Sequence, residues 1–177
     1  MVGGGQLARM THQAAIPLGQ SLKVLAASPD DAAALVAPDT QLGHHADLQA
    51  LRRFAEGCDA VTFDHEHVPP EHLRALAAEG ITVHPGPDAL VHAQDKLVMR
   101  RELDALGLPV PAFTRVSSAD DVRAFGAEHG WPCVLKTARG GYDGRGVTVL
   151  EGPEHAERVV GELLSEGAEL LVEQRVA

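Results

Sequence analysis

Aromatic residues and cysteines are both scarce in this chain of 177 residues. Aromatics make up 3% of the sequence, so Ala, Val and Leu are expected to form most of the core. The two cysteines, Cys58 and Cys133, are too few for a disulfide framework and lack metal-ligand spacing, which indicates reduced core residues. No run approaches the roughly 18 consecutive apolar residues of a membrane span. The N-terminus also lacks the pattern of a secretory signal, which predicts a cytoplasmic protein.

Basic residues are outnumbered by acidic ones, and the formal net charge is -10. This balance argues against a non-specific nucleic-acid partner and against a membrane-surface role, because both need basic patches. Lysine is the rarer basic residue, with three lysines against 12 arginines. A compact ammonium group is not interchangeable with a guanidinium group at a phosphate. Lys96 and Lys136 are therefore candidate phosphate ligands, whereas chance codon bias remains an alternative for Lys23.

Predicted strands and helices alternate in the first half of the chain. A turn of three glycines at 3–5 precedes the first helix, and two prolines at 69 and 70 suit the start of another helix. Strands that alternate with helices at this spacing predict an open parallel α/β sheet of Rossmann-like character. The predicted helices cover residues 6–18 and 70–79, and the predicted strands cover residues 21–26, 59–63 and 81–83.

The pattern changes in the second half, where two strands are joined by a glycine-rich loop. Such a pair predicts a β-hairpin in an α+β unit, so we place a domain boundary between residues 84 and 85, giving domains 1–84 and 85–177. Both ends of the sequence have the pattern of interrupted elements, and we expect a fragment of a longer protein. The predicted elements are helices at 88–106, 118–129 and 153–165, an extended linker at 108–111, and strands at 132–137, 147–150 and 168–176.

The most informative segment is the loop sequence LKTARGGYDGRG at 135–146. It has four glycines within seven positions, which lets the backbone turn sharply and direct its N–H groups at phosphate oxygens. Lys136 would place a fixed cation against the α- and β-phosphates, and Arg139 and Arg145 add positive charge on the same loop. An ordinary flexible hairpin is the alternative, but a plain turn needs neither these glycines nor these cations.

The string GGYDGRG after an LK strand resembles the carboxyaminoimidazole ribonucleotide synthetase family of the ATP-grasp superfamily. The resemblance implies a Rossmann-like pre-ATP-grasp domain at 1–84 and the first part of an ATP-grasp domain, truncated at its C-terminus, at 85–177. Four further stretches agree with that family in the same order, namely GGGQLARM at 3–10, VTFDHEHVP at 61–69, QDKLVMRRELDALGLPVPAF at 94–113 and LLVEQRV at 170–176.

The resemblance also implies an ATP site built from three places in the chain. Lys96 would reach the nucleotide from a helix, Lys136 would contact the phosphates, and the glycine-rich loop would close over them. Val147 stands where the family usually carries Gln, so a side-chain contact is in question there. The loop and the adenine hinge implied by the resemblance comprise Gly141, Tyr142, Asp143, Gly144, Arg145, Gly146, Val147, Glu173, Gln174, Arg175 and Val176.

For the second substrate, the resemblance points to Gln6 and Leu7 at the glycine turn and to Glu66 at the end of a strand. A helix N-terminus after Gly5 is a ready anion site. Asp64 stands where the family commonly carries Glu. Two alternatives stay open: a glycine turn that closes the fold without a ligand, and a solvated Glu66 that pairs with a nearby arginine. A His-x-His pair at 65–67 supplies fewer ligands than a zinc site needs, and we do not favour a metal there.

The family's reaction is the ATP-dependent carboxylation of 5-aminoimidazole ribonucleotide with bicarbonate, which gives ADP and phosphate. The resemblance implies Mg²⁺ bound with ATP, metal ligands and catalytic residues beyond Ala177, and a homodimer. The chain by itself is therefore expected to be inactive. The alternatives are another ATP-grasp ligase, of the formate-dependent glycinamide ribonucleotide transformylase or biotin carboxylase type, and a non-catalytic nucleotide-binding module.

Overall fold

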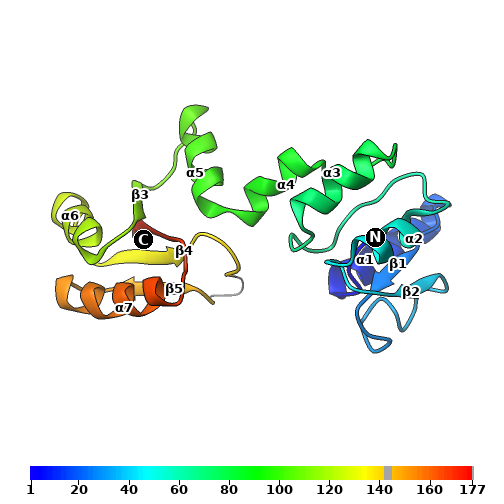
Figure 1. Ribbon diagram of the computed structural model, residues 1–177, viewed down its shortest axis with the longest axis horizontal. Helices are drawn as coiled ribbons and strands as arrows, with labels where there is room; N and C mark the ends of the chain where they lie inside the picture. The colour runs from blue at the N-terminus through cyan, green and yellow to red at the C-terminus, as the bar shows by residue number, and fades with distance from the viewer. Residues whose placement is uncertain (142–144, 177) are drawn as a thin grey trace. The chain divides into compact units, whose positions relative to one another are not determined.

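The computed structural model of the chain describes residues 1–141 and 145–176. It divides into two compact units, unit 1 at residues 1–91 and unit 2 at residues 92–177 (Figure 1). This division falls within helix α4 (Pro87–Gln94), and the domain boundary proposed between residues 84 and 85 stays a prediction. No helix among the residues described is long and apolar enough to cross a membrane.

Unit 1 contains a parallel sheet, as predicted. Strand β1 pairs in parallel with β2, and parallel bridges extend the sheet from Leu25 to Val2, from Val2 to Phe63, and from Val61 to Val83. The segments predicted as strands at 59–63 and 81–83 thus take part in the sheet through single bridges. The elements of unit 1 before α4 are α1 (Gln6–Ala15), the 3₁₀ helix η1 (Ile16–Leu18), β1 (Val24–Ala26), β2 (Thr40–Leu42), α2 (Leu48–Ala55) and α3 (Pro70–Ala78).

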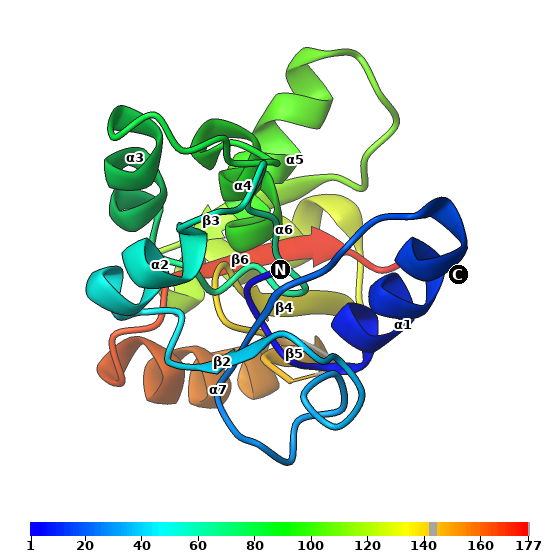
Figure 2. The same ribbon diagram turned by 90° about the vertical axis from the view of Figure 1, so that its right-hand side faces the viewer.

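Helices cover both faces of this sheet. Successive residues of a strand point to opposite faces, and β1 divides accordingly between two cores. Val24 and Ala26 pack with Ala8 of α1, whereas Leu25 packs with residues of α2 and α3 such as Phe54 and Leu73. Figure 2 shows α1 on one side of β2, and α2 and α3 on the other. The sequence analysis had identified neither β2 nor α2.

Close packing explains the glycine turn of unit 1. Gly3 has a φ of +104°, and a Cβ atom at this position would lie 1.5 Å from Oδ1 of Asp64. Gly5 donates its N–H to Oδ2 of Asp64 at 2.7 Å, and the Asp64 side chain is only 4% exposed. The Asp64 carboxylate therefore fills the turn and faces the N-terminus of α1, where negative charge is stabilised.

Unit 2 contains a four-stranded antiparallel sheet in the order β3-β6-β4-β5. Strands β4 and β5 form the predicted hairpin, with Cys133 opposite Leu150 and Lys136 opposite Val147. Helices α6 and α7 pack against one face of the sheet. The elements of unit 2 are α5 (Lys96–Ala105), β3 (Phe113–Val116), α6 (Ala119–His129), β4 (Cys133–Thr137), β5 (Val147–Leu150), α7 (Pro153–Ser165) and β6 (Leu170–Gln174).

The prediction of one helix over residues 88–106 was wrong. Asp95 has φ -133° and ψ 110°, an extended conformation that separates α4 from α5. Its side chain accepts from the N–H groups of Leu97 and Val98 at 3.0 and 3.1 Å and so caps α5. An aspartate within an apolar helical pattern does not by itself reveal this break, because Asp also occurs on exposed helix surfaces. Strand β3 was also missed, since it follows directly on the predicted linker.

We predict that Gly3→Ala destabilises the full-length protein more than Gly57→Ala. Both glycines have positive φ, +104° and +76°, but no described heavy atom lies within 4 Å of a Cβ at Gly57. Gly57→Ala should cost only the left-handed backbone penalty of about 1–2 kcal/mol. Gly3→Ala should add about 1–3 kcal/mol because the Asp64 side chain must move. Urea unfolding of the two variants measures the difference, and equal losses of stability would contradict the packing argument.

Candidate functional site

The sheet of unit 2 presents one face that α6 and α7 leave uncovered. Leu135 and Val172 pack with the two helices. Because side chains alternate along a strand, Lys136 of β4 and Glu173 of β6 point to the opposite face. Val147 of β5 shares that face and is 39% exposed. Helix α5 covers part of this face, where Leu97 packs against Leu171. The face therefore combines charged groups with an apolar strand edge, a combination that suits a nucleotide.

A buried carboxylate lies at the centre of this face. Glu173 is 5% exposed, and its two oxygen atoms contact different cations. Oε1 contacts the Lys136 ammonium group, and Oε2 accepts from Nε of Arg100 at 3.1 Å, with Nη2 of Arg100 at 3.0 Å. We call these three residues the Arg100–Glu173–Lys136 cluster. It carries one positive charge in excess, and Arg100 was not identified from the sequence because nothing in its spacing distinguishes it from surface arginines.

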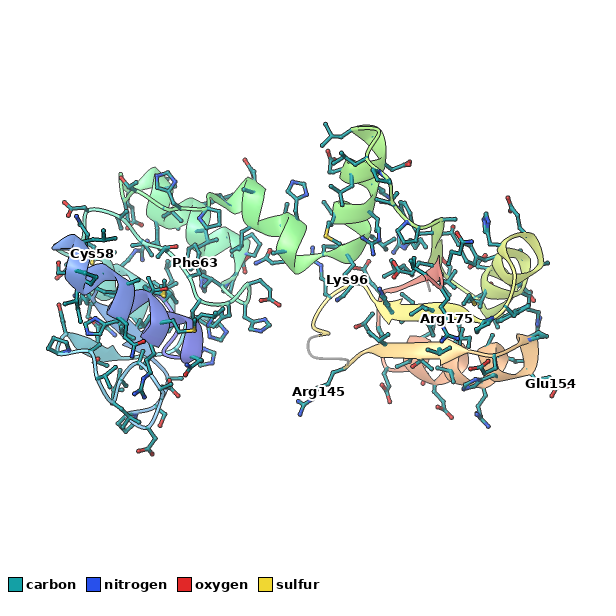
Figure 3. All side chains as sticks on the ribbon, turned by 180° about the vertical axis from the view of Figure 1, so that it is seen from behind. Cys58, Phe63, Lys96, Arg145, Glu154 and Arg175 are labelled. Atoms are coloured by element: carbon teal, nitrogen blue, oxygen red, sulfur yellow. The ribbon has the colours of Figure 1, made fainter. Side chains whose placement is uncertain are left out.

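The first turn of α5 lies against the start of the glycine-rich loop. The backbone N–H of Lys96 donates to the carbonyl oxygen of Ala138 at 2.9 Å. The Lys96 ammonium group donates to the carbonyl oxygen of Gly141 at 3.3 Å. Arg139 of the loop donates to Oδ2 of Asp95 at 3.0 Å. Figure 3 labels Lys96 at the beginning of α5, next to this loop. Asp95, which like Glu173 is a buried acidic residue of unit 2, therefore holds the helix start and the loop together.

The base of the loop is held in a tight conformation. Thr137 donates its N–H to the carbonyl oxygen of Gly146 at 2.8 Å. A Cβ atom at Gly146 would lie 2.4 Å from Oγ1 of Thr137, and one at Gly141 would lie 2.5 Å from the carbonyl oxygen of Arg145. Both positions therefore need glycine. Arg145 is exposed on the arm that leads into β5 (Figure 3). Three predicted loop residues, Tyr142, Asp143 and Gly144, lie outside the described residues.

The segment predicted to contact adenine continues from β6. Gln174 donates its N–H to the carbonyl oxygen of Ala112 at 2.8 Å, so this backbone donor is already engaged. Arg175 and Val176 are exposed. A cavity of about 330 Å³ lies beside them, lined by Gln174, Arg175 and the α6–β4 connection at 129–132. Of the predicted hinge residues, Glu173 is thus buried, whereas Gln174, Arg175 and Val176 are exposed.

The residues predicted for the second substrate lie in unit 1. Gln6 and Leu7 are exposed at the start of α1, and Leu7 is 60% exposed. Glu66 is half-buried in the bend that follows Phe63. Asp64 and Glu66 do not face one side of a strand, because residues 64–66 form a bend and the Asp64 carboxylate packs into the glycine turn. The assignment of Gln6, Leu7 and Glu66 to a substrate stays a prediction.

His65 and His67, which flank Glu66 in the sequence, gather in space with His44 and His45. The ring centroids lie 4.2 Å apart for His44 and His45, 4.7 Å for His45 and His65, and 5.1 Å for His65 and His67. Burial, followed by the charges of the neighbouring rings, lowers the pKa of His45 to about 4. Burial also lowers the pKa of His65. The rings of His45 and His65 are therefore neutral at pH 7.

No group of three or more His, Cys, Asp or Glu within the described part of the chain could hold a metal ion. In unit 2, the buried Asp95 carboxylate is paired with Arg139, and the buried Glu173 carboxylate is paired with Arg100 and Lys136. These residues therefore do not fit a magnesium site by themselves.

Comparison with known proteins identifies the family. Residues 1–94, more than half of the chain, match the family described as the ribonucleotide synthetase preATP-grasp domain. The chain belongs to this family. Residues 101–177 match the ATP-grasp domain, so the preATP-grasp domain is followed by an ATP-grasp segment. The predicted fold class is thereby confirmed.

Relatives of this preATP-grasp chain share a common name. The N5-carboxyaminoimidazole ribonucleotide synthase of Mycobacterium leprae is 56% identical over 184 residues, covering 99% of this chain and 42% of that protein. A synthetase of similar name from Staphylococcus aureus, solved in complex with ADP, has a TM-score of 0.86 at 29% identity, covering 99% of this chain and 47% of that one. The Aspergillus clavatus synthase complexed with ATP has a TM-score of 0.86 at 26% identity, with coverages of 99% and 47%. The chain spans less than half the length of these proteins.

We predict that Asp95→Ala destabilises the full-length protein more than Asp47→Ala. Asp47 caps α2 by the same geometry, accepting from Gln49 N at 2.9 Å. Each variant should lose a helix cap, which costs about 1 kcal/mol. Asp95→Ala also removes the pair with Arg139, whose side chain is 53% exposed, so the additional loss should be at most about 1 kcal/mol. Urea unfolding measures both, and a larger loss for Asp47→Ala would show that the Arg139 contact adds nothing.

Proposed function

We propose that the full-length protein carboxylates 5-aminoimidazole ribonucleotide with bicarbonate at the expense of ATP, giving N5-carboxyaminoimidazole ribonucleotide, ADP and phosphate. The observation that carries this proposal is the arrangement of Lys96 and Lys136 around the base of the glycine-rich loop. Lys96 contacts the loop through the carbonyl oxygen of Gly141. Lys136 lies near the end of β4, where this strand leads into the loop, and it pairs with Val147 of β5. The choice of ribonucleotide is supported by the names of the relatives that align with almost the whole chain.

The chemistry requires two transfers. The γ-phosphoryl group of ATP passes to a bicarbonate oxygen, which forms carboxyphosphate and releases ADP. The exocyclic amine of the imidazole then attacks the activated carboxyl carbon, phosphate leaves, and the amine loses a proton. Phosphoryl transfer depends mainly on positioning and on stabilisation of charge. In this proposal Lys96 and Lys136 would supply positive charge, and the loop N–H groups would bind phosphate oxygens.

The resemblance extends the proposal to parts of the enzyme outside this chain. Mg²⁺ would accompany ATP, with ligands expected beyond Ala177, and neutralise the phosphate charge. The second half of the ATP site would come from that region too. A homodimer and a cytoplasmic location belong to the same proposal.

We predict that Lys136→Ala in the full-length enzyme raises the KM for ATP and slows phosphoryl transfer, while Lys23→Ala changes little. Loss of a charge-assisted contact to phosphate costs roughly 1.5–3 kcal/mol, on the order of a ten- to a hundred-fold change. Lys23 is a suitable control because its ammonium group lies 5.4 Å from the ring centroid of Phe54, within unit 1. ADP release that depends on bicarbonate and 5-aminoimidazole ribonucleotide provides the measurement.

The same assay tests the reaction itself. If wild-type enzyme releases ADP only with glycinamide ribonucleotide and formate, or with biotin, another ATP-grasp ligase is the answer. Equal effects of Lys136→Ala and Lys23→Ala would contradict the assignment of the phosphate ligand.

We further predict that Glu66→Gln raises the KM for 5-aminoimidazole ribonucleotide and leaves the KM for ATP near its original value. Glu66 lies at the carboxyl end of the parallel sheet, where open α/β folds bind ligands, and its carboxylate would accept hydrogen bonds from the substrate. The substitution keeps the shape of the side chain and removes its charge. Glu71→Gln, on an exposed residue of α3, is the matched control. An unchanged KM for the ribonucleotide would refute this role for Glu66.

A further inference from the structure

The function proposed for Lys136 leaves Arg100 unexplained. The Arg100 side chain is 18% exposed and that of Lys136 is 22% exposed, while the Glu173 side chain between them is 6% exposed. A carboxylate buried to this degree is costly unless it is paired. Because each oxygen of Glu173 contacts a different cation, the loss of one contact leaves the other in place.

If Lys136 binds phosphate, two anionic groups compete for its ammonium group. One is the Glu173 carboxylate that it contacts in the structure, and the other is the α- or β-phosphate of the nucleotide. If Glu173 had no other partner, movement of the ammonium group toward phosphate would leave a buried carboxylate unpaired. That penalty would oppose nucleotide binding. Arg100 removes this opposition because its contact with Oε2 does not depend on Lys136.

Charge leads to the same conclusion. With both cations present, the Arg100–Glu173–Lys136 cluster has one positive charge in excess, although the chain as a whole has a formal net charge of -10. Without Arg100, Glu173 and Lys136 would neutralise each other and the site would attract phosphate less strongly. Arg100 therefore acts in two ways, by keeping Glu173 paired and by adding positive charge. Both should strengthen binding of the phosphate groups and have little effect on binding of the nucleoside.

We propose that Arg100 is a positioning residue that keeps the Glu173 carboxylate paired and so allows Lys136 to exchange from Glu173 to the nucleotide phosphates. This inference rests on the proposed function only in requiring that ATP binds at this face. Its signature is specific, because the loss of Arg100 should weaken binding of a nucleotide and leave binding of adenosine nearly unchanged.

The first experiment compares ADP and adenosine affinities of full-length Arg100→Met, Arg100→Lys and Arg101→Met by calorimetry. Arg100→Met keeps most of the side-chain length and removes the charge, and we expect a loss of about tenfold in ADP affinity. Arg100→Lys should restore most of that loss. Arg101 is exposed, so Arg101→Met controls for the removal of an arginine from α5. Adenosine affinity should be similar in all variants.

The second experiment repeats Arg100→Met in a Glu173→Gln background. A neutral amide leaves no buried carboxylate when Lys136 moves, so Arg100→Met should then change ADP affinity by less than about twofold. The full tenfold loss in this background would overturn the inference. Thermal unfolding of each variant checks that it is folded, and if the double variant is not, the ratio of ADP to adenosine affinity in Arg100→Met decides alone.

Two further outcomes separate the inference from the proposed function. If Arg100→Met lowers the affinities for ADP and for adenosine by the same factor, Arg100 only supports the shape of the hinge. The inference is then wrong, but the proposal that the protein binds ATP is unaffected. If wild-type protein binds neither ADP nor ATP, the proposed function fails and the inference fails with it.

Discussion

Asp95 takes an extended conformation between α4 and α5, and its buried carboxylate joins two parts of unit 2, the start of α5 and the glycine-rich loop. One oxygen caps α5 through Leu97 and Val98, and the other accepts from Arg139. The capped turn in turn presents Lys96, whose backbone and side chain both contact the glycine-rich loop. An uninterrupted helix would direct this lysine elsewhere, because each residue of a helix is rotated by about 100° from its neighbour. The position of Lys96, which we propose contacts ATP, therefore depends on the break at Asp95.

A second acidic residue has a comparable structural role in unit 1. The Asp64 carboxylate fills the space left by Gly3 and accepts from the N–H of Gly5. The resemblance to known enzymes had left the shorter acid at this position in doubt, and the packing accounts for it, since Gly3 has no room for a side chain. Asp64 is thus occupied by packing, and Glu66, two residues later, is the acidic residue that we propose binds the substrate.

The candidate site lies on the face of the unit 2 sheet opposite α6 and α7, and it has an excess of positive charge within a strongly acidic chain. Glu173 does not cancel the charges around it, because Arg100 and Lys136 share one carboxylate. Local arrangement thus outweighs net charge, since the interaction with a bound phosphate is dominated by groups a few ångströms away, and more distant charges are screened. A nucleotide would meet fixed cations, a glycine-rich backbone and an apolar strand edge on a single surface.

The sequence by itself determined the parallel sheet of unit 1, the β4–β5 hairpin and the glycine-rich loop, and it singled out Lys96 and Lys136 as candidate phosphate ligands. These features depend on local spacing, on glycine content and on the rarity of lysine, all of which can be read along the chain. Only the tertiary structure decided that Asp95 interrupts a helix, that Asp64 packs into the glycine turn, and that Arg100 shares Glu173 with Lys136. Arg100 and Glu173 are separated by 73 positions, and no local pattern records a contact that forms only when α5 packs against β6.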